Sequence, residues 1–483
     1  MEIIKANSSY LHQSMTAQPF INKYSCAEKT IEKIEHLNLR DIIYDLSGGA
    51  TPTAKGESYL EEHDKRAIPF LRIQNVGENE LIKENMNFIN PETHYNYLKR
   101  SILKEKDVLV TITGRVGTAC VIEDNFKGNI NQHIARISIL KSFNPYFVSL
   151  FINTELGKLL TNQFVTGGTR IALDYDTLLN VKIPLIQKHA QDIIVDFYKS
   201  IKKGLSKIQE ECSKIKKDIE PFLLNKLGLT RINKNVNQYN FSASDIIYRF
   251  DYLNVNAKKK TYLNFLGKTI RLADVIYSCK KGNSPKPEEI QEEVENIKEF
   301  YPMMRIQDIS KENKIQSSIG VYVRKYIKGF NYTFLEKEDL IFVITGATIG
   351  KIAFVEELKD NILLGNDMIA VRFIEDTYNP AFIYHLFNTV FYQEEIKTSI
   401  TGQTNGHLDP EDIFAILVPD ITVTEQNHIV KEISEKFLNK IETKEKLIAQ
   451  IKEKSKELIE KLILEKADIK VAEIDINKIY KLF

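Results

Sequence analysis

Cysteine is scarce in this chain of 483 residues, and its four cysteines lie far apart. Cys26, Cys120, Cys212 and Cys279 form no CxxC pair, so their spacing favours reduced thiols over a disulfide framework or a metal site. Long apolar runs are missing too. Nowhere do about 18 apolar residues follow one another, and the opening MEIIKANSSY has no apolar signal core. We therefore expect a soluble, cytoplasmic protein without a membrane segment.

An excess of charge of one sign is also absent. The 66 basic and 65 acidic residues leave a formal net charge of +1, so no global basic field attracts the chain to nucleic acid. This balance argues against a lone, non-specific DNA binder. It remains compatible with a protein that reads base edges while partner subunits share the phosphate contacts.

Motifs for catalysis are missing as well. TGATIGKI (345–352) is one residue short of the phosphate-loop spacing GxxxxGK[ST] and has Ile352 where Ser or Thr must bind magnesium. A glycine-permitted turn between two strands explains it better. The nine histidines show no HExxH spacing, and no GxSxG, Cys–His or methyltransferase NPPY or DPPY motif occurs. We therefore expect no catalytic residue, metal or cofactor in this chain.

Two amphipathic helices dominate the pattern of the chain. The first is predicted over residues 189–220, with Pro221 stopping or kinking it. Its apolar residues recur every three or four positions, which is typical of a heptad seam, and residues 428–466 show the same pattern. A narrow apolar stripe needs a partner, so we expect the two helices to pack antiparallel. The predicted helix–helix interface consists of Ile194, Ile201, Leu205, Ile208, Ile215, Ile441, Ile448 and Leu458.

The segments before the two helices form an internal repeat. LRDIIYDLSGGATP (39–52) and LADVIYSCKKGNSP (272–285) share six of fourteen residues at a constant offset. The repeat continues through IPFLRIQNV and YPMMRIQDI, KEKDVLVTITG and EKEDLIFVITG, NQHIARI and NDMIAVR, and LDYDTLLNVKIP and LDPEDIFAILVP. The alignment of NQHIARI with NDMIAVR pairs His133 with Met368, which argues against a catalytic role shared by both copies.

Each copy combines strand and helix signals. The runs VLVTIT, IARISIL, LIFVIT and MIAVRF predict strands, and residues 147–163 and 382–396 have helical spacing. The predicted fold class is α+β: two repeated mixed α/β domains separated by two long antiparallel coiled-coil helices, with pseudo-twofold symmetry. The predicted parts are a first domain (1–186), a central helix (187–229), a second domain (230–424), a C-terminal helix (425–466) and a tail (467–483). Residues 1–37 have no assigned role.

Polar side chains in paired loops are the candidate binding residues. Each loop taken alone resembles an ordinary surface turn, but four pairs recur with altered residues at matching positions. Arg, Asn and Gln can make bidentate contacts to base edges. A protein that recognises two different half-sites would therefore keep the same backbone framework in both copies and differ in the residues that contact bases. The candidate DNA-binding residues are Gly49, Thr51, Arg72, Gln74, Arg115, Asn131, Gln132, Thr169, Arg170, Lys280, Lys281, Asn283, Arg305, Gln307, Asn366, Asp367, Thr404 and Asn405.

The doubled order of these segments resembles the DNA-specificity subunit of type I restriction–modification enzymes, over about residues 38–465. The resemblance is carried by the G-x-TP/SP turn, the RIQN/RIQD segment, the D-[VL]-[LI] run ending in TG, the NQ/ND loop and the LD…P segment before each helix. Residues 1–37 match 234–271 poorly, and DIIYRFDY (245–252) has no twin.

The resemblance implies two target-recognition domains held apart by two antiparallel helices. Each domain would read one half of a split, asymmetric site in double-stranded DNA, in a system of defence against foreign DNA. Two modification subunits would bind the chain and methylate adenine with S-adenosylmethionine, and restriction subunits, if present, would cleave DNA with ATP and Mg. This chain would perform neither reaction.

Two other classes stay open at this stage. A coiled-coil protein-binding scaffold would show the same repeat and helices but no sequence-dependent DNA binding. An independent DNA enzyme would need catalytic motifs that this sequence does not contain.

Overall fold

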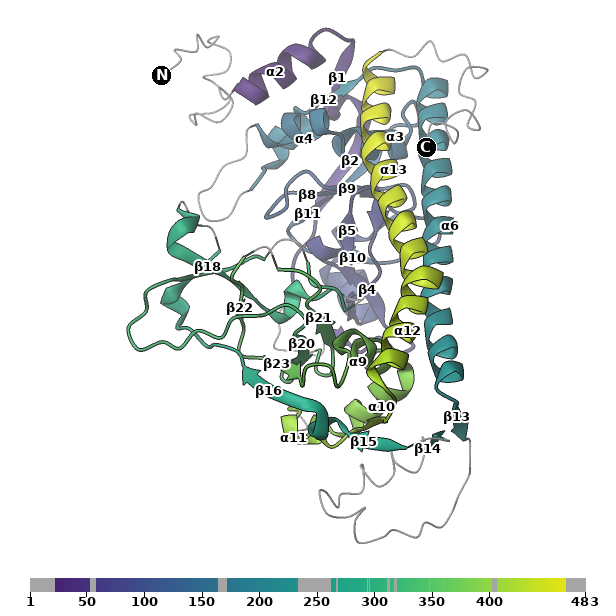
Figure 1. Ribbon diagram of the computed structural model, residues 1–483. Coiled ribbons are helices and arrows are strands. Elements are labelled where there is room, and N and C mark those ends of the chain that lie inside the picture. Colours follow the sequence, from purple (N-terminus) through teal and green to yellow (C-terminus); the bar gives the residue numbers. More distant parts are fainter. Residues whose placement is uncertain are drawn as a thin grey trace. The chain divides into compact units, whose positions relative to one another are not determined.

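The computed structural model describes residues 22–52, 58–163, 172–232, 262–265, 268–292, 294, 296–310, 313–316, 319–346, 348–358, 360–401 and 406–465. The chain divides into two compact units. Unit 1 comprises Met1–Gln209 with Glu445–Phe483, and unit 2 comprises Glu210–Lys444. Both mix strands and helices (Figure 1). Most of residues 230–250, at the start of the predicted second domain, lie outside the described residues, as do the DIIYRFDY segment and the predicted tail.

A four-stranded antiparallel sheet forms the centre of unit 1. In sheet order its strands are β2 (Ile43–Gly48), β11 (Ile134–Ile139), β8 (Val108–Thr111) and β9 (Ala119–Val121). Residues of β8 alternate between two cores: Val108 and Val110 join one cluster, whereas Leu109 joins another. Because both faces of these strands are covered, every residue of β8 and β11 is buried, including the polar Thr111, Arg136 and Ser138. Both predicted strands of this copy are confirmed.

A second sheet of unit 1 mixes parallel and antiparallel neighbours. Its strands in order are β10 (Asn129–Ile130), β4 (Ile68–Leu71), β7 (Asn87–Ile89) and β3 (Tyr59–Leu60), with only β10 and β4 parallel. Residues 131–133 lead from β10 directly into β11, so this short loop joins the two sheets. The smaller elements are α2 (Asn22–Ile31), β1 (His36–Asn38) paired with β12 (Lys182–Pro184), β5 (Val76–Gly77) paired with β6 (Glu80–Leu81), and α5 (Tyr175–Leu179).

Unit 2 repeats both sheets with the same strand order and directions. Its first sheet is β16 (Ile276–Lys281), β23 (Met368–Phe373), β20 (Leu340–Val343) and β21 (Ile352–Phe354). Its second is β22 (Leu363–Leu364), β18 (Phe300–Met304), β19 (Tyr322–Arg324) and β17 (Ile290–Gln291), with β22 parallel to β18. Two sheet-rich α+β domains are therefore confirmed, and pseudo-twofold symmetry stays a prediction. The smaller elements are β13 (Leu229–Ile232) paired with β14 (Tyr262–Phe265), β15 (Thr269–Arg271) paired with β24 (Leu417–Pro419), and α11 (Pro410–Phe414).

Each helix predicted inside a domain is two helices instead of one, so this detail of the prediction is wrong. An Asn–Thr pair lies at both breaks, and Thr154 and Thr389 are N-caps of the second helices. Thr154 Oγ1 accepts a hydrogen bond from the backbone amide of Gly157 at 3.0 Å, which stabilises a new helix start. The helices are α3 (Pro145–Ile152), α4 (Glu155–Asn162), α9 (Pro380–Phe387) and α10 (Val390–Thr398).

The first long helix, α6 (Lys188–Lys226), has 39 residues and continues through Pro221. Of the two predicted effects of Pro221, stopping the helix near Glu220 is wrong, and a kink stays a prediction. An interior proline removes a helical hydrogen bond and destabilises a helix by about 3 kcal/mol. Here Leu223 is fully buried in the core of unit 2, and the ring of Phe222 lies 5.3 Å from that of Phe437. This packing holds the last turn beyond the proline.

The second long helical segment consists of α12 (Val423–Ile433), a π-helical turn (Ser434–Leu438) and α13 (Asn439–Leu464). It begins five residues before the predicted His428, because Thr422 and Glu425 form a capping box. In unit 2 this segment runs antiparallel to α6. Glu211 Oε2 lies 2.6 Å from Lys444 Nζ, and Lys226 Nζ lies 2.5 Å from Glu432 Oε1.

The residues of the predicted helix–helix seam differ in burial. Ile194 and Ile201 are buried in the larger core of unit 1, against which Leu205, Ile208 and Leu458 pack half-buried. Ile441 is buried in unit 2, and Ile215 and Ile448 are half-buried. On α13 the stripe in the unit 1 core is Ile451, Ile459 and Ile463. The stripe is broader than a two-residue seam because this half of α13 packs on the domain core as well as on α6.

A buried ion pair recurs in both first sheets. In unit 1, Arg136 lies between Asp107, at 3.2 Å, and Asp45, at 2.6 Å. In unit 2, Arg372 Nε lies 2.6 Å from Asp339 Oδ1. Hydrogen bonding to Arg136 lowers the pKa of Asp45. Asp107 and Asp339 are almost completely buried, so each pair fixes how the neighbouring strands align.

A buried glutamine ties each domain to the helix that follows it. Gln191 accepts a hydrogen bond from the backbone amide of Asn144 at 2.8 Å, and Gln426 accepts one from that of Asn379 at 2.8 Å. Both glutamines have no exposed surface. Gln191 and Gln426 therefore perform the same structural task in both units.

Candidate nucleic-acid interface

Two glycines bring the paired turns against the second sheet of their own unit. A Cβ added to Gly49 would lie 1.7 Å from the carbonyl oxygen of Ile130, and one added to Gly282 would lie 1.9 Å from that of Gly365. Only glycine allows so close an approach of two backbones. The neighbouring polar residues of each turn are thereby placed beside the loop that joins the two sheets.

In unit 1 this joining loop carries a chain of hydrogen bonds. The Thr51 hydroxyl donates to Oε1 of the exposed Gln132. Gln132 Nε2 lies 3.2 Å from His133 Nε2, and His133 Nδ1 lies 2.6 Å from Thr113 Oγ1. The Asn131 side chain is buried and accepts from the backbone amide of His133 at 3.1 Å. The chain links three segments that are far apart in the sequence.

The other candidates of unit 1 gather around the 3₁₀ turn Ile73–Asn75, which follows β4. Arg72 Nη2 and Gln74 Nε2 both donate to the carbonyl oxygen of Asn85, at 3.3 and 3.1 Å. Arg115 Nη2 donates to the carbonyl oxygen of Val76 at 2.5 Å. The backbone amide of Asn131 donates to Leu71, the last residue of β4. The structure thus brings the described unit 1 candidates into one region.

The candidates of unit 2 have more mixed surroundings. The Asn283 amide is used inside the fold, because its Oδ1 accepts from the backbone amide of Thr333 at 2.6 Å and its Nδ2 donates to the Asn331 carbonyl at 2.5 Å. Lys280 and Lys281 are exposed on β16. They point to opposite faces of that strand.

Arg305 and Gln307 lie at the 3₁₀ turn Ile306–Asp308, the counterpart of Ile73–Asn75. Gln307 is exposed, and Arg305 is half-buried with its Nε shielded from solvent and without a hydrogen-bond partner among the described residues. Four candidates, Thr169, Arg170, Thr404 and Asn405, lie outside the described residues.

The joining loops of the two units correspond differently from the sequence alignment, so the pairing of His133 with Met368 is wrong. The backbone carbonyl of His133 accepts from the amide of Ile112, and that of Asp367 accepts from the amide of Ile344, both at 2.9 Å. The hydroxyls of Thr113 and Thr345, in the two TG turns, bond to the side chains of His133 and Asp367. The alignment relied on a shared Asn and a shared Ile–Ala, whereas strand pairing decides the register. The corresponding pairs are Asn131 and Gly365, Gln132 and Asn366, and His133 and Asp367.

The glycine-rich TGATIGKI segment forms the turn between the antiparallel strands β20 and β21, as predicted. Gly346 and Gly350 have φ values of +91° and +86°, which favour glycine. Lys351 Nζ donates to the carbonyl oxygen of Ser310 at 3.0 Å. A phosphate loop leads from a strand into a helix, so this hairpin is a different structure.

Comparison with known proteins connects this region to DNA recognition. Residues 31–220 match the family described as type I restriction modification DNA specificity domain. The matched range contains both sheets of unit 1 and most of α6. Apart from residues 210–220, unit 2 lies outside this range, but it repeats the strand order.

Two specificity subunits are related to the chain in sequence. The type I restriction enzyme EcoBI specificity subunit of Escherichia coli is 27% identical over 155 residues, which is 32% of each chain. The MjaVIII specificity subunit of Methanocaldococcus jannaschii is 26% identical over 186 residues, 36% of this chain and 43% of that protein. The matches therefore span less than half of the length of these relatives.

A solved structure of similar description is the type I restriction–modification S subunit from M. genitalium. It is 15% identical and covers 89% of this chain and 96% of its own, with a TM-score of 0.37. This score is too low for conclusions about the arrangement of the whole chain.

Several residues that hold the candidate loops are absent from the predicted set. The side chains of His133, Thr113 and Thr345 bond within these loops, and the Asn85 carbonyl accepts from Arg72 and Gln74. The repeated TG after each apolar run was a usable signal, because it placed a hydroxyl at the same point in both copies. The bonds themselves join residues from distant segments, and the sequence order does not reveal them.

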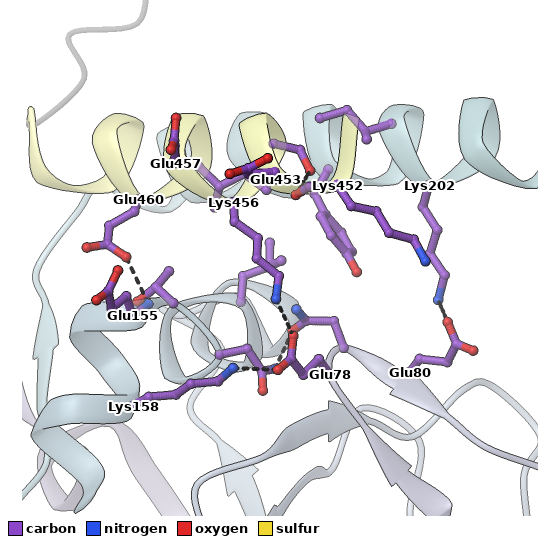
Figure 2. Close-up of a pocket in the computed structure, with 18 of the residues that line it drawn as sticks. Glu78, Glu80, Glu155, Lys158, Lys202, Lys452, Glu453, Lys456, Glu457 and Glu460 are labelled. Carbon is purple, nitrogen blue, oxygen red and sulfur yellow. Dashed lines mark hydrogen bonds and ion pairs between the residues drawn. The ribbon is translucent and has the colours of Figure 1, made fainter. Parts of the chain in front are cut away.

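A charged groove of about 1840 Å³ lies elsewhere in unit 1, between α13, α6 and α4 (Figure 2). Its charges are paired: Glu78 bonds to Lys158 and Lys456, and Glu80 bonds to Lys202. Burial raises the pKa of Glu78, but the hydrogen bonds from the two lysines outweigh this and lower it. Because opposite charges neutralise each other, the groove offers no basic surface for DNA, and none of the candidate DNA-binding residues that the structure describes lines it.

The groove shows how the C-terminal end of α13 is attached to the domain of unit 1. Glu460 of α13 accepts hydrogen bonds from the backbone amides of Glu155, at 2.9 Å, and Leu156, at 3.4 Å (Figure 2). These amides belong to the N-terminus of α4, where a carboxylate is favourable. The contact holds the C-terminal half of α13 on the domain of unit 1.

Among the described residues, no cluster of three or more His, Cys, Asp or Glu side chains could hold a metal ion. No helix in the described ranges is both long and apolar enough to cross a membrane.

Proposed function

We propose that this chain is the DNA sequence-specificity subunit of a type I restriction–modification complex. The observation that carries the proposal is the match of residues 31–220 to the type I DNA specificity domain family, combined with the same strand order in unit 2. Each unit reads one half of a split, asymmetric site in double-stranded DNA. The chain itself is non-catalytic.

The long helices form the scaffold of the proposed complex. The antiparallel pairing of α6 with α12 and α13 in unit 2 supports a role of the helices in setting the gap between the half-sites. Two modification subunits dock on this scaffold and methylate adenine with S-adenosylmethionine. Restriction subunits, where the system has them, supply ATP- and Mg-dependent cleavage.

The test is to map methylated adenine. The chain is co-expressed with the modification subunit of its own operon in a host without adenine methylation, and modified adenines are mapped across the genome. We expect a single split motif with a fixed gap. A stable complex without any modification would favour the alternative, a coiled-coil scaffold that binds only proteins.

A further inference from the structure

Gln132 of unit 1 is exposed, yet its amide is held by two neighbours. Thr51 donates to its Oε1, and its Nε2 lies 3.2 Å from His133 Nε2. Most exposed glutamines rotate freely and lose conformational entropy when they bind a ligand. A side chain that is fixed before binding avoids part of this cost.

An imidazole can hold the Gln132 amide through either of its two neutral tautomers. With the proton on Nδ1, His133 Nε2 accepts from Gln132 Nε2, and Nδ1 donates to Thr113 Oγ1 at 2.6 Å. With the proton on Nε2, the amide turns by 180°, its oxygen accepts from His133 and its nitrogen donates to Thr51 Oγ1. In both arrangements His133 and Thr51 hold the amide in place and use one of its donors and one of its acceptors.

The bonds inside unit 1 leave a defined set of free hydrogen-bonding groups on Gln132. An amide has two N–H donors and two acceptor lone pairs, and one of each is already used. One donor and one acceptor remain side by side. This pair matches the major-groove edge of adenine, where N6 donates and N7 accepts. It does not match guanine, which offers two acceptors there.

We propose that Gln132 reads an adenine in the half-site bound by unit 1 and that His133 is a positioning residue that fixes the amide for this contact. The inference rests on the proposed function, because it takes duplex DNA as the ligand. It goes further by assigning one base to one side chain.

Unit 2 has different chemistry at the corresponding positions. Asp367 replaces His133 and accepts from Thr345 Oγ1 at 2.5 Å, so it offers no imidazole to orient a neighbouring amide. Within the described part of unit 2 no hydrogen bond holds the side chain of the exposed Asn366. At these corresponding positions, an amide fixed in advance is therefore a property of unit 1 and of the half-site that it reads.

The experiment measures binding of the purified complex of full-length chain and modification subunits to short duplexes. Each position of the mapped site is replaced in turn by the other base pairs. For Gln132→Ala we expect discrimination at one adenine of one half-site to fall on the order of tenfold, with the other half-site unchanged. Asn366→Ala is the matched control and should leave the first half-site unaffected.

Two substitutions at His133 test the positioning role. In His133→Asn the shorter amide can still bond to Thr113 but does not reach Gln132, so the same adenine should be read less strictly. In His133→Gln the longer side chain places an acceptor near the former Nε2, so reading of the adenine should be largely restored. A merely structural role for His133 would not produce this difference.

Each failure has a distinct meaning. If the unsubstituted complex has no sequence preference, the proposed function fails. If it reads a split site but Gln132→Ala relaxes no position, or relaxes one that is not adenine, this inference is overturned and the function stands. Equal behaviour of the two His133 variants would refute the positioning role. If His133→Asn weakens both half-sites through misfolding, Thr51→Val decides: it should relax the same adenine, and unchanged reading overturns the inference.

Discussion

At the scale of single residues, the two units keep one interaction while changing its source. Arg136 and Arg372 both pair with the buried aspartate that precedes the central strand. By strand pairing, Arg136 corresponds to Ala370 and Arg372 corresponds to Ser138. Positions two residues apart in a strand share a face, so either one can deliver the guanidinium to the same carboxylate.

Replacing Arg136 by Met should destabilise unit 1 strongly. The substitution leaves the carboxylate of Asp107 buried and unpaired, and we expect a loss of about 3–5 kcal/mol in the free energy of unfolding, measured with urea. The double variant Arg136→Met with Asp107→Asn should recover much of this loss, because the unpaired charge is then absent. Equal instability of both variants would show that packing, not charge, dominates.

His385 should make unit 2 sensitive to mild acid. Burial lowers its pKa to about 4 from the ordinary 6.5. Between these pH values the unfolded chain binds a proton that the folded chain does not, so stability is complete above pH 6.5 and falls as pH decreases toward 4. The side chain is partly exposed, so we expect a loss of about 2 kcal/mol rather than the roughly 3 kcal/mol of a fully buried group.

Urea unfolding of the full chain at pH 7 and pH 4.5 measures this effect of His385. His385→Gln is the control, since it keeps a polar side chain of similar reach but cannot titrate. The variant should lose less stability on acidification than the unsubstituted chain. Equal losses would assign the acid sensitivity to other groups.

At the scale of elements, local signals and tertiary packing compete for the ends of helices. The Asn–Thr pairs interrupt two helices because threonine caps a new start. Pro221 fails to interrupt α6, because the residues after it are anchored in the core of unit 2. A capping hydroxyl supplies a partner for a free backbone amide, whereas proline only removes a bond that packing can replace.

Replacing Pro221 by Ala should therefore stabilise the protein. Alanine restores the helical hydrogen bond and removes the crowding of the preceding turn, and the anchored apolar residues stay in place. We expect a gain of about 1–3 kcal/mol in the free energy of unfolding. Ser213→Ala, at an exposed position of the same helix, is the control and should change stability by less than about 0.5 kcal/mol. A loss of stability at position 221 would mean that the proline is needed for the packing of the last turn.

At the scale of the whole molecule, the proposed function assigns the gap between half-sites to the length of the two helices. Removing residues 207–213 and 442–448 deletes one heptad from each helix, about 10 Å of rod. We expect the methylated motif to keep both half-sites and to lose about three base pairs of spacing, at roughly 3.4 Å per base pair.

Two controls accompany the heptad deletion. Deleting 207–213 alone should prevent assembly, because one helix then no longer matches the other. Inserting one heptad in both helices should lengthen the gap by a similar amount. An unchanged gap in the double deletion would refute the role of the helices as a spacer.

The sequence by itself determined the repeat, the α+β class, the central strands and the two long helices. These features depend on periodic apolar residues and on turn residues, which act over a few neighbouring positions. The apolar runs of β8, β11, β20 and β23 and the heptads of α6 and α13 are examples.

Only the tertiary structure decided the register of the joining loops, the survival of α6 beyond Pro221 and the partners of Gln132. Each of these depends on strands or side chains from distant segments, and their free energies are comparable to those of the local signals they override. The loop alignment shows the consequence: two shared identities paired His133 with Met368, whereas the backbone hydrogen bonds pair it with Asp367. Spatial contact, which sequence order does not encode directly, determined which side chains can act together.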